Sequence, residues 1–302
     1  MRLPFLGSVV PPHVFCLLDE GVTYARVRPG SPAGFEESRS FRYPSGPFAP
    51  GAPVRVTREA LSEAVRAARA LSGGKLARAS VVYPDAWARI LPVELETMPT
   101  DDDAGREMVS WKLKKLLPAG TGDMALVWRT MPVVSDEKRV LVAAAPRETM
   151  ESIESAFDEL GVRVGYLAPA SLALLEGLAP VLSAGGGKDF GLLHRSAGGT
   201  TFFIVRDRDA IFFRQRPADD DDPEREARLS LSYYAEKLKG PGLSAVYVHD
   251  ELPGRPLEKV AAFPVAPVPL SSRVLDADPD FDARVASQPE LMAGFAAVVG
   301  SR

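Results

Sequence analysis

The fold is decided by the stretch Lys188-Asp-Phe-Gly-Leu-Leu-His-Arg-Ser-Ala-Gly-Gly-Thr-Thr-Phe-Phe-Ile-Val-Arg-Asp-Arg-Asp-Ala-Ile-Phe-Phe-Arg-Gln-Arg216, which contains three apolar runs. These runs are 190–193, 200–205 and 210–213. β-Branched and aromatic residues dominate the second run, as is typical of a buried or half-buried strand. The separator 196–199 contains glycine, which takes positive φ without strain, and the separator 206–209 contains aspartate, which bonds its own backbone. The stretch therefore predicts a three-stranded antiparallel meander.

A second, shorter hairpin is predicted near the start of the chain. Val14-Phe-Cys-Leu-Leu18 is followed by Asp19-Glu-Gly21 and then by Val22-Thr-Tyr-Ala-Arg-Val27. The two apolar runs have strand character, and the turn between them carries an acid and a glycine. Two such hairpins, one opening each half of the chain, predict a duplicated architecture.

Length and composition indicate one large or two medium domains. The 302 residues are 46% hydrophobic and 25% charged, as in an ordinary soluble protein with buried cores. The net charge is −4 with both signs mixed along the chain, so the basic stripe that nucleic-acid binding needs is missing. The single cysteine, Cys16, lies in an apolar run and is expected to be a buried hydrophobic residue.

The sequence predicts neither a signal peptide nor a membrane span. Pro4, Pro11 and Pro12 interrupt the apolar residues at the N-terminus, so no h-region of sufficient length forms. No run approaches the ~18 apolar residues that a membrane span requires. We therefore expect a cytoplasmic protein.

The segment up to residue 85 is expected to complete the first half of the duplication. Between 29 and 53 the chain is rich in Gly, Pro and Ser and holds one irregular strand, around 40–43. Thr57 then caps a helix that runs to about Leu71 and ends at Gly73-Gly74. A strand follows at 79–83 and is closed by proline and aspartate.

A segment of different character, 86–164, predicts a compact α/β subdomain. Its expected elements are a strand at 87–95, a helix at 104–117, strands at 124–132 and 139–144, and a helix at 146–161. The first helix opens after Thr100-Asp-Asp-Asp103, where acids suit the helix dipole, and Pro118 stops it. The elements expected after this segment are a strand at 162–167, a helix at 169–178, a helix at 223–238, a strand at 244–248 and a helix at 289–299.

This order of elements resembles the actin-like type IV pilus assembly proteins of the PilM type over nearly the whole chain. The matching residues are Asp19-Glu-Gly-Val-Thr-Tyr-Ala-Arg26, Val82-Tyr-Pro-Asp85, Leu91-Pro-Val-Glu-Leu95, Met98-Pro99, Trp111, Pro118, Trp128, Arg139-Val-Leu-Val-Ala-Ala-Ala-Pro-Arg147 and Leu231-Ser-Tyr-Tyr234. Each match is local, and the resemblance rests on their common order and spacing.

The resemblance implies an α/β, actin-like (ribonuclease-H-like) fold of two domains, with an inserted α/β subdomain of the FtsA and PilM kind. Residues 1–85 would form the first actin-like subdomain, completed by 165–182 and 289–302. Residues 86–164 would form the inserted subdomain, and 183–288 the second actin-like domain, whose lid is reduced.

The resemblance also implies where a nucleotide would lie in an active relative. The residues in question are Asp19, Gly21 and Arg26 of the first hairpin and Gly198, Gly199 and Thr200 of the second. The second hairpin departs from the family's D-x-G, since it reads His194-Arg-Ser196, and Val248-His-Asp-Glu251 replaces the glycine pair that contacts adenosine. A helical insert over the base is missing between 216 and 223, and one aspartate is a poor site for Mg²⁺. We expect a vestigial site without catalytic residues, cofactor or hydrolysis, and weak ATP and magnesium binding stays as the open alternative.

The function that the resemblance implies is a non-catalytic cytoplasmic scaffold of the type IV pilus inner-membrane assembly platform. In the family, this scaffold binds the N-terminal peptide of a PilN-like single-span membrane protein, in a groove between the first subdomain and the inserted one. The groove candidates here are Leu91, Val93, Leu95, Trp111 and Trp128. As lone aromatics, the two tryptophans are alternatively core residues. Pilus assembly ATPases would be further partners, and the protein would be peripheral at the inner membrane through its partner.

Alternatives of other classes remain open. One is an active actin-fold ATPase or kinase, which needs Asp19, Arg26 and the 198–200 turn to hold phosphates. Another is the related cytoplasmic domain of type II secretion platforms, of the GspL kind, which shares the fold and differs in its partner. A third is an α/β enzyme that works through His194; no triad accompanies this residue, which is otherwise predicted to be a turn residue.

Other motifs are assigned structural roles. Asp19-Glu-Gly21 is also a common hairpin turn in any β protein. Gly185-Gly-Gly-Lys188 lacks the upstream glycine and the Ser/Thr of a P-loop, so it is predicted to be a linker. The run Asp219-Asp-Asp-Asp222 lacks EF-hand spacing and is predicted to be a solvated loop before a helix. His13 and His249 have no Cys or His at metal-ligand spacing, so no metal is expected.

Overall fold

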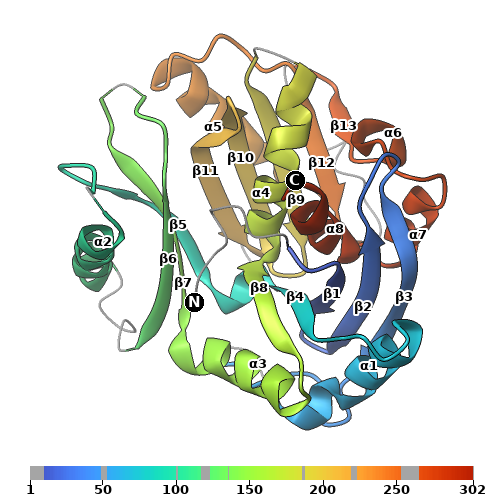
Figure 1. Ribbon diagram of the computed structural model, residues 1–302. Coiled ribbons are helices and arrows are strands. Elements are labelled where there is room, and N and C mark those ends of the chain that lie inside the picture. Colours follow the sequence, from blue (N-terminus) through green and yellow to red (C-terminus); the bar gives the residue numbers. More distant parts are fainter. Residues whose placement is uncertain are drawn as a thin grey trace. The chain divides into compact units, whose positions relative to one another are not determined.

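The computed structural model describes residues 10–48, 53–99, 101–116, 123–134, 136–185, 188–218, 223–252 and 265–301. The chain divides into two compact units, and Figure 1 labels their elements. Unit 1 consists of Met1–Trp87, Ala145–Val181 and Ser271–Arg302, and unit 2 of Ala88–Ala144 and Leu182–Leu270. None of the helices in the described ranges has the length and apolar character that crossing a bilayer requires.

Unit 1 is built on a mixed five-stranded sheet with the order β3-β2-β1-β4-β8. Its strands are β1 (His13–Leu17), β2 (Gly21–Arg28), β3 (Gly34–Arg42), β4 (Arg78–Tyr83) and β8 (Arg163–Pro169). β1, β2 and β3 form an antiparallel meander, whereas β1, β4 and β8 run parallel. The central strands β1 and β4 are buried almost throughout, as expected of strands that are covered on both faces.

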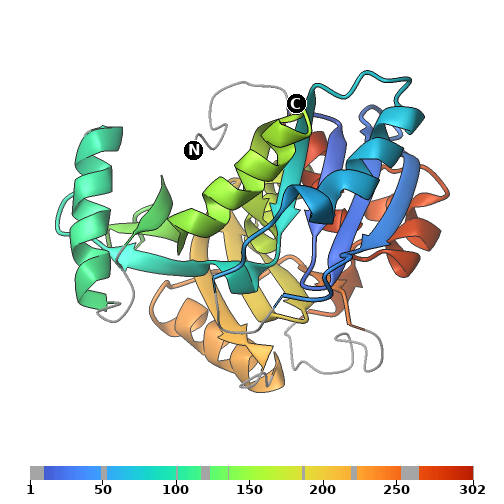
Figure 2. The same ribbon diagram turned by 90° about the horizontal axis from the view of Figure 1, so that it is seen from below.

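Helices cover both faces of the unit 1 sheet, and Figure 2 shows them from a second direction. They are α1 (Arg58–Leu71), α3 (Arg147–Glu159), α4 (Ala170–Leu182), α6 (Ser272–Leu275), α7 (Phe281–Ser287) and α8 (Leu291–Val299). Phe15 of β1 packs edge-on against Phe157 of α3, with ring centroids 5.0 Å apart. Val14, on the opposite face of β1, lies against α8 at Gly294. The sheet is therefore the middle layer of unit 1.

Unit 2 repeats this sheet, with the order β11-β10-β9-β12-β13. Its strands are β9 (Phe190–Ser196), β10 (Gly199–Arg206), β11 (Asp209–Pro217), β12 (Val246–Asp250) and β13 (Pro267–Pro269). The predicted meander is confirmed, because β10 pairs antiparallel with both β9 and β11, and β12 runs parallel to β9 and β13. Helix α5 (Pro223–Glu236) comes between β11 and β12 in the chain, as α1 comes between β3 and β4. The common order confirms the predicted duplicated architecture.

The turns of the unit 2 meander use the residues that the sequence singles out. Asp207 and Arg208 connect β10 to β11 with φ values of 48° and 75°, the pair of left-handed conformations that two-residue hairpins favour. Gly199 opens β10 with φ of 125°, and a Cβ there would lie 1.9 Å from the carbonyl oxygen of Arg216. Glycine at position 199 is therefore required by the sheet itself.

A smaller three-stranded sheet, with the order β5-β7-β6, also belongs to unit 2. Its elements are β5 (Arg89–Glu94), helix α2 (Asp102–Leu116), β6 (Met124–Thr130) and β7 (Arg139–Pro146), of which the last two residues fall in unit 1. Sheet and helix share an apolar core of Val93, Leu95, Val109, Leu113, Val140, Val142 and Ala144. The strand–helix–strand–strand order is the one predicted for the inserted subdomain.

Local structure agrees with the prediction at α1 and differs from it elsewhere. Thr57 Oγ1 accepts a hydrogen bond from the Ala60 backbone, and the helix ends before two glycines with positive φ. The strand expected at 87–95 begins only at Arg89, because Asp85–Trp87 form a 3₁₀ turn, η1. β3 is longer than the strand expected at 40–43. The sequence does not predict its full length, because its charged and mostly exposed residues obscure the alternation of apolar and polar positions. The sequence does not predict α6, α7 or β13.

The two units also divide the chain differently from the predicted domains. The predicted insertion 86–164 includes α3, which belongs to unit 1 and contacts α1. The predicted second domain 183–288 includes α6 and α7, which also belong to unit 1. The short 3₁₀ turn η2 (Ser183–Gly185) follows α4, while Gly186 and Gly187 of the predicted linker lie outside the described residues. So does the run of four aspartates at 219–222.

Candidate functional sites

The first hairpin turn of unit 1 is held by the side chain of Trp87 and by the backbone of Phe48. Asp19 Oδ1 accepts a hydrogen bond of 2.8 Å from the indole nitrogen of Trp87, and the Asp19 carbonyl accepts one of 2.9 Å from the Phe48 backbone. Trp87 is itself buried and stacks on Tyr83, with ring centroids 6.4 Å apart. The carboxylate that a phosphate loop would use for magnesium therefore already has a partner within the protein.

Gly21 and Arg26 have structural explanations in the same hairpin. A Cβ at Gly21 would lie 2.2 Å from the Phe41 carbonyl oxygen, so β3 requires glycine at this position. Arg26 lies opposite His13, four residue pairs away from the pair Leu17–Val22 that borders the turn. At about 3.4 Å per residue, this register separates Arg26 from the turn by roughly 14 Å. Arg26 instead pairs with Glu36 at 3.0 Å.

Unit 1 holds a second carboxylate that the sequence analysis does not single out as functional. Asp85 follows β4, is buried, and its Oδ1 accepts a hydrogen bond of 2.9 Å from the Ser171 backbone at the start of α4. A carboxylate at the start of a helix accepts a hydrogen bond from a backbone N–H group that has no partner within the helix. It also interacts favourably with the positive end of the helix dipole. Asp85 therefore caps α4, which explains its burial without a ligand.

The second hairpin brings Gly198, Gly199 and Thr200 together at one turn, as predicted. The Gly198 backbone donates to Ser196 Oγ at 3.3 Å, which closes the turn locally. The Thr200 hydroxyl is buried without a hydrogen-bond partner among the described residues. The residue type that would complete a phosphate loop, an acid before this turn, is replaced by His194 and Arg195 at the end of β9.

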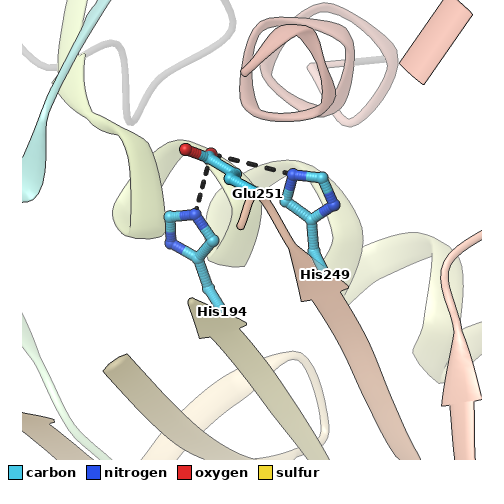
Figure 3. Close-up of side chains that lie close together, drawn as sticks. All are labelled: His194, His249 and Glu251. Atoms are coloured by element: carbon cyan, nitrogen blue, oxygen red, sulfur yellow. Dashed lines mark hydrogen bonds and ion pairs between the residues drawn. The ribbon is translucent and has the colours of Figure 1, made fainter. Parts of the chain in front are cut away.

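His194 belongs to a side-chain cluster with His249 and Glu251 (Figure 3). β9 and β12 are parallel neighbours in which His194 and His249 lie opposite each other. Glu251 lies two residues beyond His249, and positions i and i+2 of an extended chain face the same side. The sheet therefore presents all three side chains on one face.

The distances within this cluster are short. The Nε2 atom of His194 lies 2.9 Å from Glu251 Oε1, and the Nε2 atom of His249 lies 3.7 Å from the same oxygen. The two imidazole rings stack, with centroids 5.6 Å apart and planes inclined by 10°. His194 and His249 are only 1% and 4% exposed.

The backbone around the cluster is fixed by sheet hydrogen bonds. The Glu251 backbone donates to the Arg195 carbonyl at 2.8 Å, which extends the β9–β12 pairing to this residue. Arg195 binds Asp250 through two hydrogen bonds, of 3.0 and 2.6 Å. Burial alone would raise the pKa of the Glu251 carboxyl, but the charges and hydrogen bonds of His194 and His249 outweigh it and lower the pKa to about 2. Glu251 is therefore a carboxylate at all physiological pH values.

The prediction that His194 is a turn residue is wrong. His194 lies within β9, two residues before its end, and is buried. His249 has no partner at metal-ligand spacing along the sequence, but β12 brings it beside His194, which is 55 residues away in the chain. Two signals could have found the cluster. His249-Asp-Glu251 places two ligand types at i and i+2 at the end of a predicted strand, and the duplicated order places β12 beside β9 as β4 lies beside β1.

The groove candidates occupy different environments in the small sheet of unit 2. Val93 and Leu95 lie in its core, so their assignment to a binding surface is a prediction that burial does not favour. Leu91 and Trp128 are half-buried and pack against the same core, where the Trp128 ring lies over Gly105 of α2. Trp111 is 52% exposed.

Trp111 lies on the solvent side of α2. Helix periodicity turns it away from Val109 and Leu113, which point into the core. Its ring is covered in part by Lys115, whose Nζ lies 3.6 Å from the ring centroid, a cation–π contact at i and i+4. The alternative that Trp111 is a core residue is therefore wrong.

Strand β6 forms an edge of the small sheet and is half-buried along most of its length. Leu126 and Trp128 pack toward α2, so Val127 between them faces the other side of the sheet. Next to it, Arg129 pairs with Asp209 of the meander. An edge strand with half-exposed apolar residues can accept a further strand.

Comparison with known proteins gives similarities of fold. No family model and no curated protein sequence matches the chain. The chain is similar to a solved structure described as a PilM-PilN type IV pilus biogenesis complex, with 17% identity, coverage of 97% of this chain and 98% of that chain, and a TM-score of 0.67. It is also similar to the cytoplasmic domain of EpsL, an inner membrane component of the type II secretion system of Vibrio cholerae (11% identity, 87% and 92% coverage, TM-score 0.51).

A third similar structure is a protein of unknown function with an actin-like ATPase fold from Bacteroides thetaiotaomicron, with 12% identity, 91% and 95% coverage, and a TM-score of 0.51. The chain thus has an actin-like α/β fold with a small additional sheet, and its resemblance to the PilM type is confirmed at the level of the fold.

Proposed function

We propose that this chain is a non-catalytic scaffold in the inner-membrane assembly platform of a type IV pilus, located in the cytoplasm and peripheral to the membrane through its partner. The observation that carries the proposal is the likeness to the PilM-PilN complex over 97% of the chain. The likeness to EpsL supports a platform role of the same kind and keeps a type II secretion platform as the second candidate. The partner of the scaffold is the N-terminal cytoplasmic peptide of a PilN-like single-span membrane protein.

The absence of catalysis is supported by the two hairpin turns. Asp19 is engaged by Trp87, and Arg26 lies at the far end of its strand from that turn. The second turn follows a histidine and an arginine where an active actin-fold ATPase would place an acid. Transfer of a phosphoryl group depends on positioned charges and metal ions, and neither turn offers a set of them.

We place the peptide at the edge strand β6. A peptide strand paired there gains main-chain hydrogen bonds, and its alternate side chains reach both faces of the small sheet. Trp128 contributes apolar surface toward α2, and Val127 faces the other side of the sheet. Leu91 lies on β5, at the opposite edge of this sheet, and is not part of the site at β6.

Peptide binding provides the first test. The peptide to test has the N-terminal sequence of a single-span membrane protein whose gene lies next to the gene for this chain. It is expected to bind the purified protein in a fluorescence anisotropy titration. Val127→Glu is expected to weaken binding by about tenfold or more, because the interface would then desolvate a charge. Thr130→Glu, at the exposed end of the same strand, is the matched control and is expected to leave affinity within about twofold. Equal affinity of the two variants would exclude β6 as the site, and no binding of such a peptide to the wild type would exclude the scaffold proposal.

Titration with Mg-ATP provides the second test and separates the scaffold from an ATPase. Isothermal titration of the wild type is expected to give no binding in the micromolar range, and Asp19→Ala is expected to change nothing. Trp87→Phe, which removes the indole donor from Asp19, serves as the companion variant and is expected to bind no nucleotide either. Micromolar binding that Asp19→Ala abolishes would contradict this expectation and favour the ATPase alternative.

A further inference from the structure

The cluster of His194, His249 and Glu251 has no counterpart in the equivalent strands of unit 1. There β1 and β4 pair apolar residues at the corresponding place, with Phe15 opposite Val81 and Cys16 opposite Val82. The same strand order is thus stable without an imidazole or a carboxyl group at this place between its central strands. Three buried or nearly buried polar side chains cost free energy to desolvate, so their presence in unit 2 calls for an interaction that the fold alone does not require.

The geometry of the three side chains suits a small divalent cation. One ligand atom from each residue lies within 4.8 Å of the other two. Around a tetrahedral ion with bonds of about 2.0–2.1 Å, neighbouring ligand atoms are roughly 3.3 Å apart. The pair His194–Glu251, at 2.9 Å, would open slightly and the pair His249–Glu251, at 3.7 Å, would close slightly. The two imidazole nitrogens, which lie within 4.8 Å of each other, would also move closer together. Side-chain rotations of this kind convert the hydrogen-bonded cluster into a coordination site.

The ligand types select the class of metal. Two imidazole nitrogens and one carboxylate oxygen suit zinc and the neighbouring late transition metals, whereas calcium and magnesium prefer sets of oxygen ligands. Both histidine Nε2 atoms are directed at the same carboxylate oxygen, as Figure 3 shows. Convergence of several ligand atoms on one point is what a bound ion needs.

We propose that His194, His249 and Glu251 bind one zinc-class divalent ion, with a water molecule as the fourth ligand. Glu251 is the most exposed of the three, with 14% of its side chain accessible, so the water lies on its side of the cluster. The ion cross-links the carboxyl ends of β9 and β12 and fixes the residue that follows β12. This role is structural and is independent of the proposed scaffold function.

The test uses the full chain, stripped of metal with a chelator, supplied with zinc in slight excess and passed over a desalting column. Elemental analysis is expected to find about one zinc per chain in the wild type. His249→Gln and Glu251→Gln are expected to lower zinc affinity by more than about 100-fold, since even the loss of outer-shell partners costs 10- to 100-fold. The matched control is His13→Gln, which removes the remaining histidine and is expected to retain zinc.

A second measurement keeps the test valid if a variant folds poorly. Zinc added to the metal-free wild type is expected to raise its melting temperature by several degrees, because an ion that binds only the native state stabilises it. Cobalt in place of zinc is expected to give the visible absorption bands of a tetrahedral site. The proposal is overturned if the wild type retains no zinc and shows no shift, or if Glu251→Gln and His249→Gln retain as much zinc as His13→Gln.

Discussion

Asp189→Ala is expected to destabilise unit 2 by about 3 kcal/mol, because it removes the acceptor of three hydrogen bonds, two from Arg206 and one from Tyr234. Asp189 is 3% exposed. Its carboxylate accepts two hydrogen bonds from the Arg206 guanidinium, at 2.8 and 2.6 Å, and one of 2.6 Å from the Tyr234 hydroxyl. The network thereby joins the entry to β9, the end of β10 and helix α5.

Further hydrogen bonds hold the main chain at Asp189 in place. The Asp189 carbonyl accepts hydrogen bonds from both the backbone and the hydroxyl of Ser244, which leads into β12. Burial, followed by the hydrogen bond to Asp189, raises the pKa of Tyr234, so its hydroxyl stays protonated and donates. The Ser244 hydrogen bonds go to the main chain and persist in Asp189→Ala, so the variant loses only the contacts of the carboxylate.

Urea unfolding followed by circular dichroism measures this effect. Glu236→Ala removes an exposed acid from α5 and is the control, expected to change stability by less than about 0.5 kcal/mol. Asp189→Asn keeps the shape and loses the charge, so it is expected to fall between the control and alanine. An unfolding midpoint of Asp189→Ala equal to that of Glu236→Ala would contradict the role given to the network.

Gly177→Val is expected to prevent stable folding of unit 1. Gly177 lies in α4, and a Cβ at this position would be 2.0 Å from the carbonyl oxygen of Ala296 in α8. Gly300, just after α8, approaches the same glycine so closely that its own Cβ would lie 2.2 Å from the Gly177 Cα. The two helices touch through their backbones, and no side chain can rotate to make room.

Gly177→Ala separates two opposing effects. Alanine favours a helix over glycine by about 1 kcal/mol. Overpacking of a tight core costs about 1–3 kcal/mol, and here the obstacle is backbone, so the net effect is expected to be destabilising. Soluble yield and melting temperature measure both variants. Ala70→Val, at an exposed position of α1, is the control for a β-branched residue and is expected to lose only about 0.6 kcal/mol. A Gly177→Ala protein that melts at or above the wild-type temperature would refute the backbone contact.

The sequence predicts the parts of the fold that depend on local chemistry. The meander of unit 2 follows from apolar runs separated by residues that accept left-handed backbone, and Asp207, Arg208 and Gly199 adopt that backbone in the structure. The Thr57 cap is local in the same sense. The full length of β3 cannot be predicted in this way, because its pairing with β2, rather than its own composition, makes it a strand.

The candidate sites are less predictable, because they depend on strands that meet across long stretches of sequence. Asp19 lies in the predicted turn, but its partner Trp87 reaches it from 68 residues away. The neighbourhood of His194 and His249 likewise exists only once β12 has paired with β9. Val93 and Leu95 show the opposite limit, since an apolar strand residue is equally compatible with a binding surface and with a core.

The pairing of β9 with β12, which brings the two histidines together, also determines the surroundings of any acid that is introduced at position 194, before the second hairpin turn. An aspartate at position 194 would stand next to Glu251, whose carboxylate already lies within hydrogen-bond distance of the side chain there. An aspartate carboxylate is shorter than the imidazole but still faces Glu251, so each carboxylate would raise the pKa of the other and weaken the site for magnesium. The expected result of this single substitution is therefore a pair of coupled carboxylates, not a restored magnesium site.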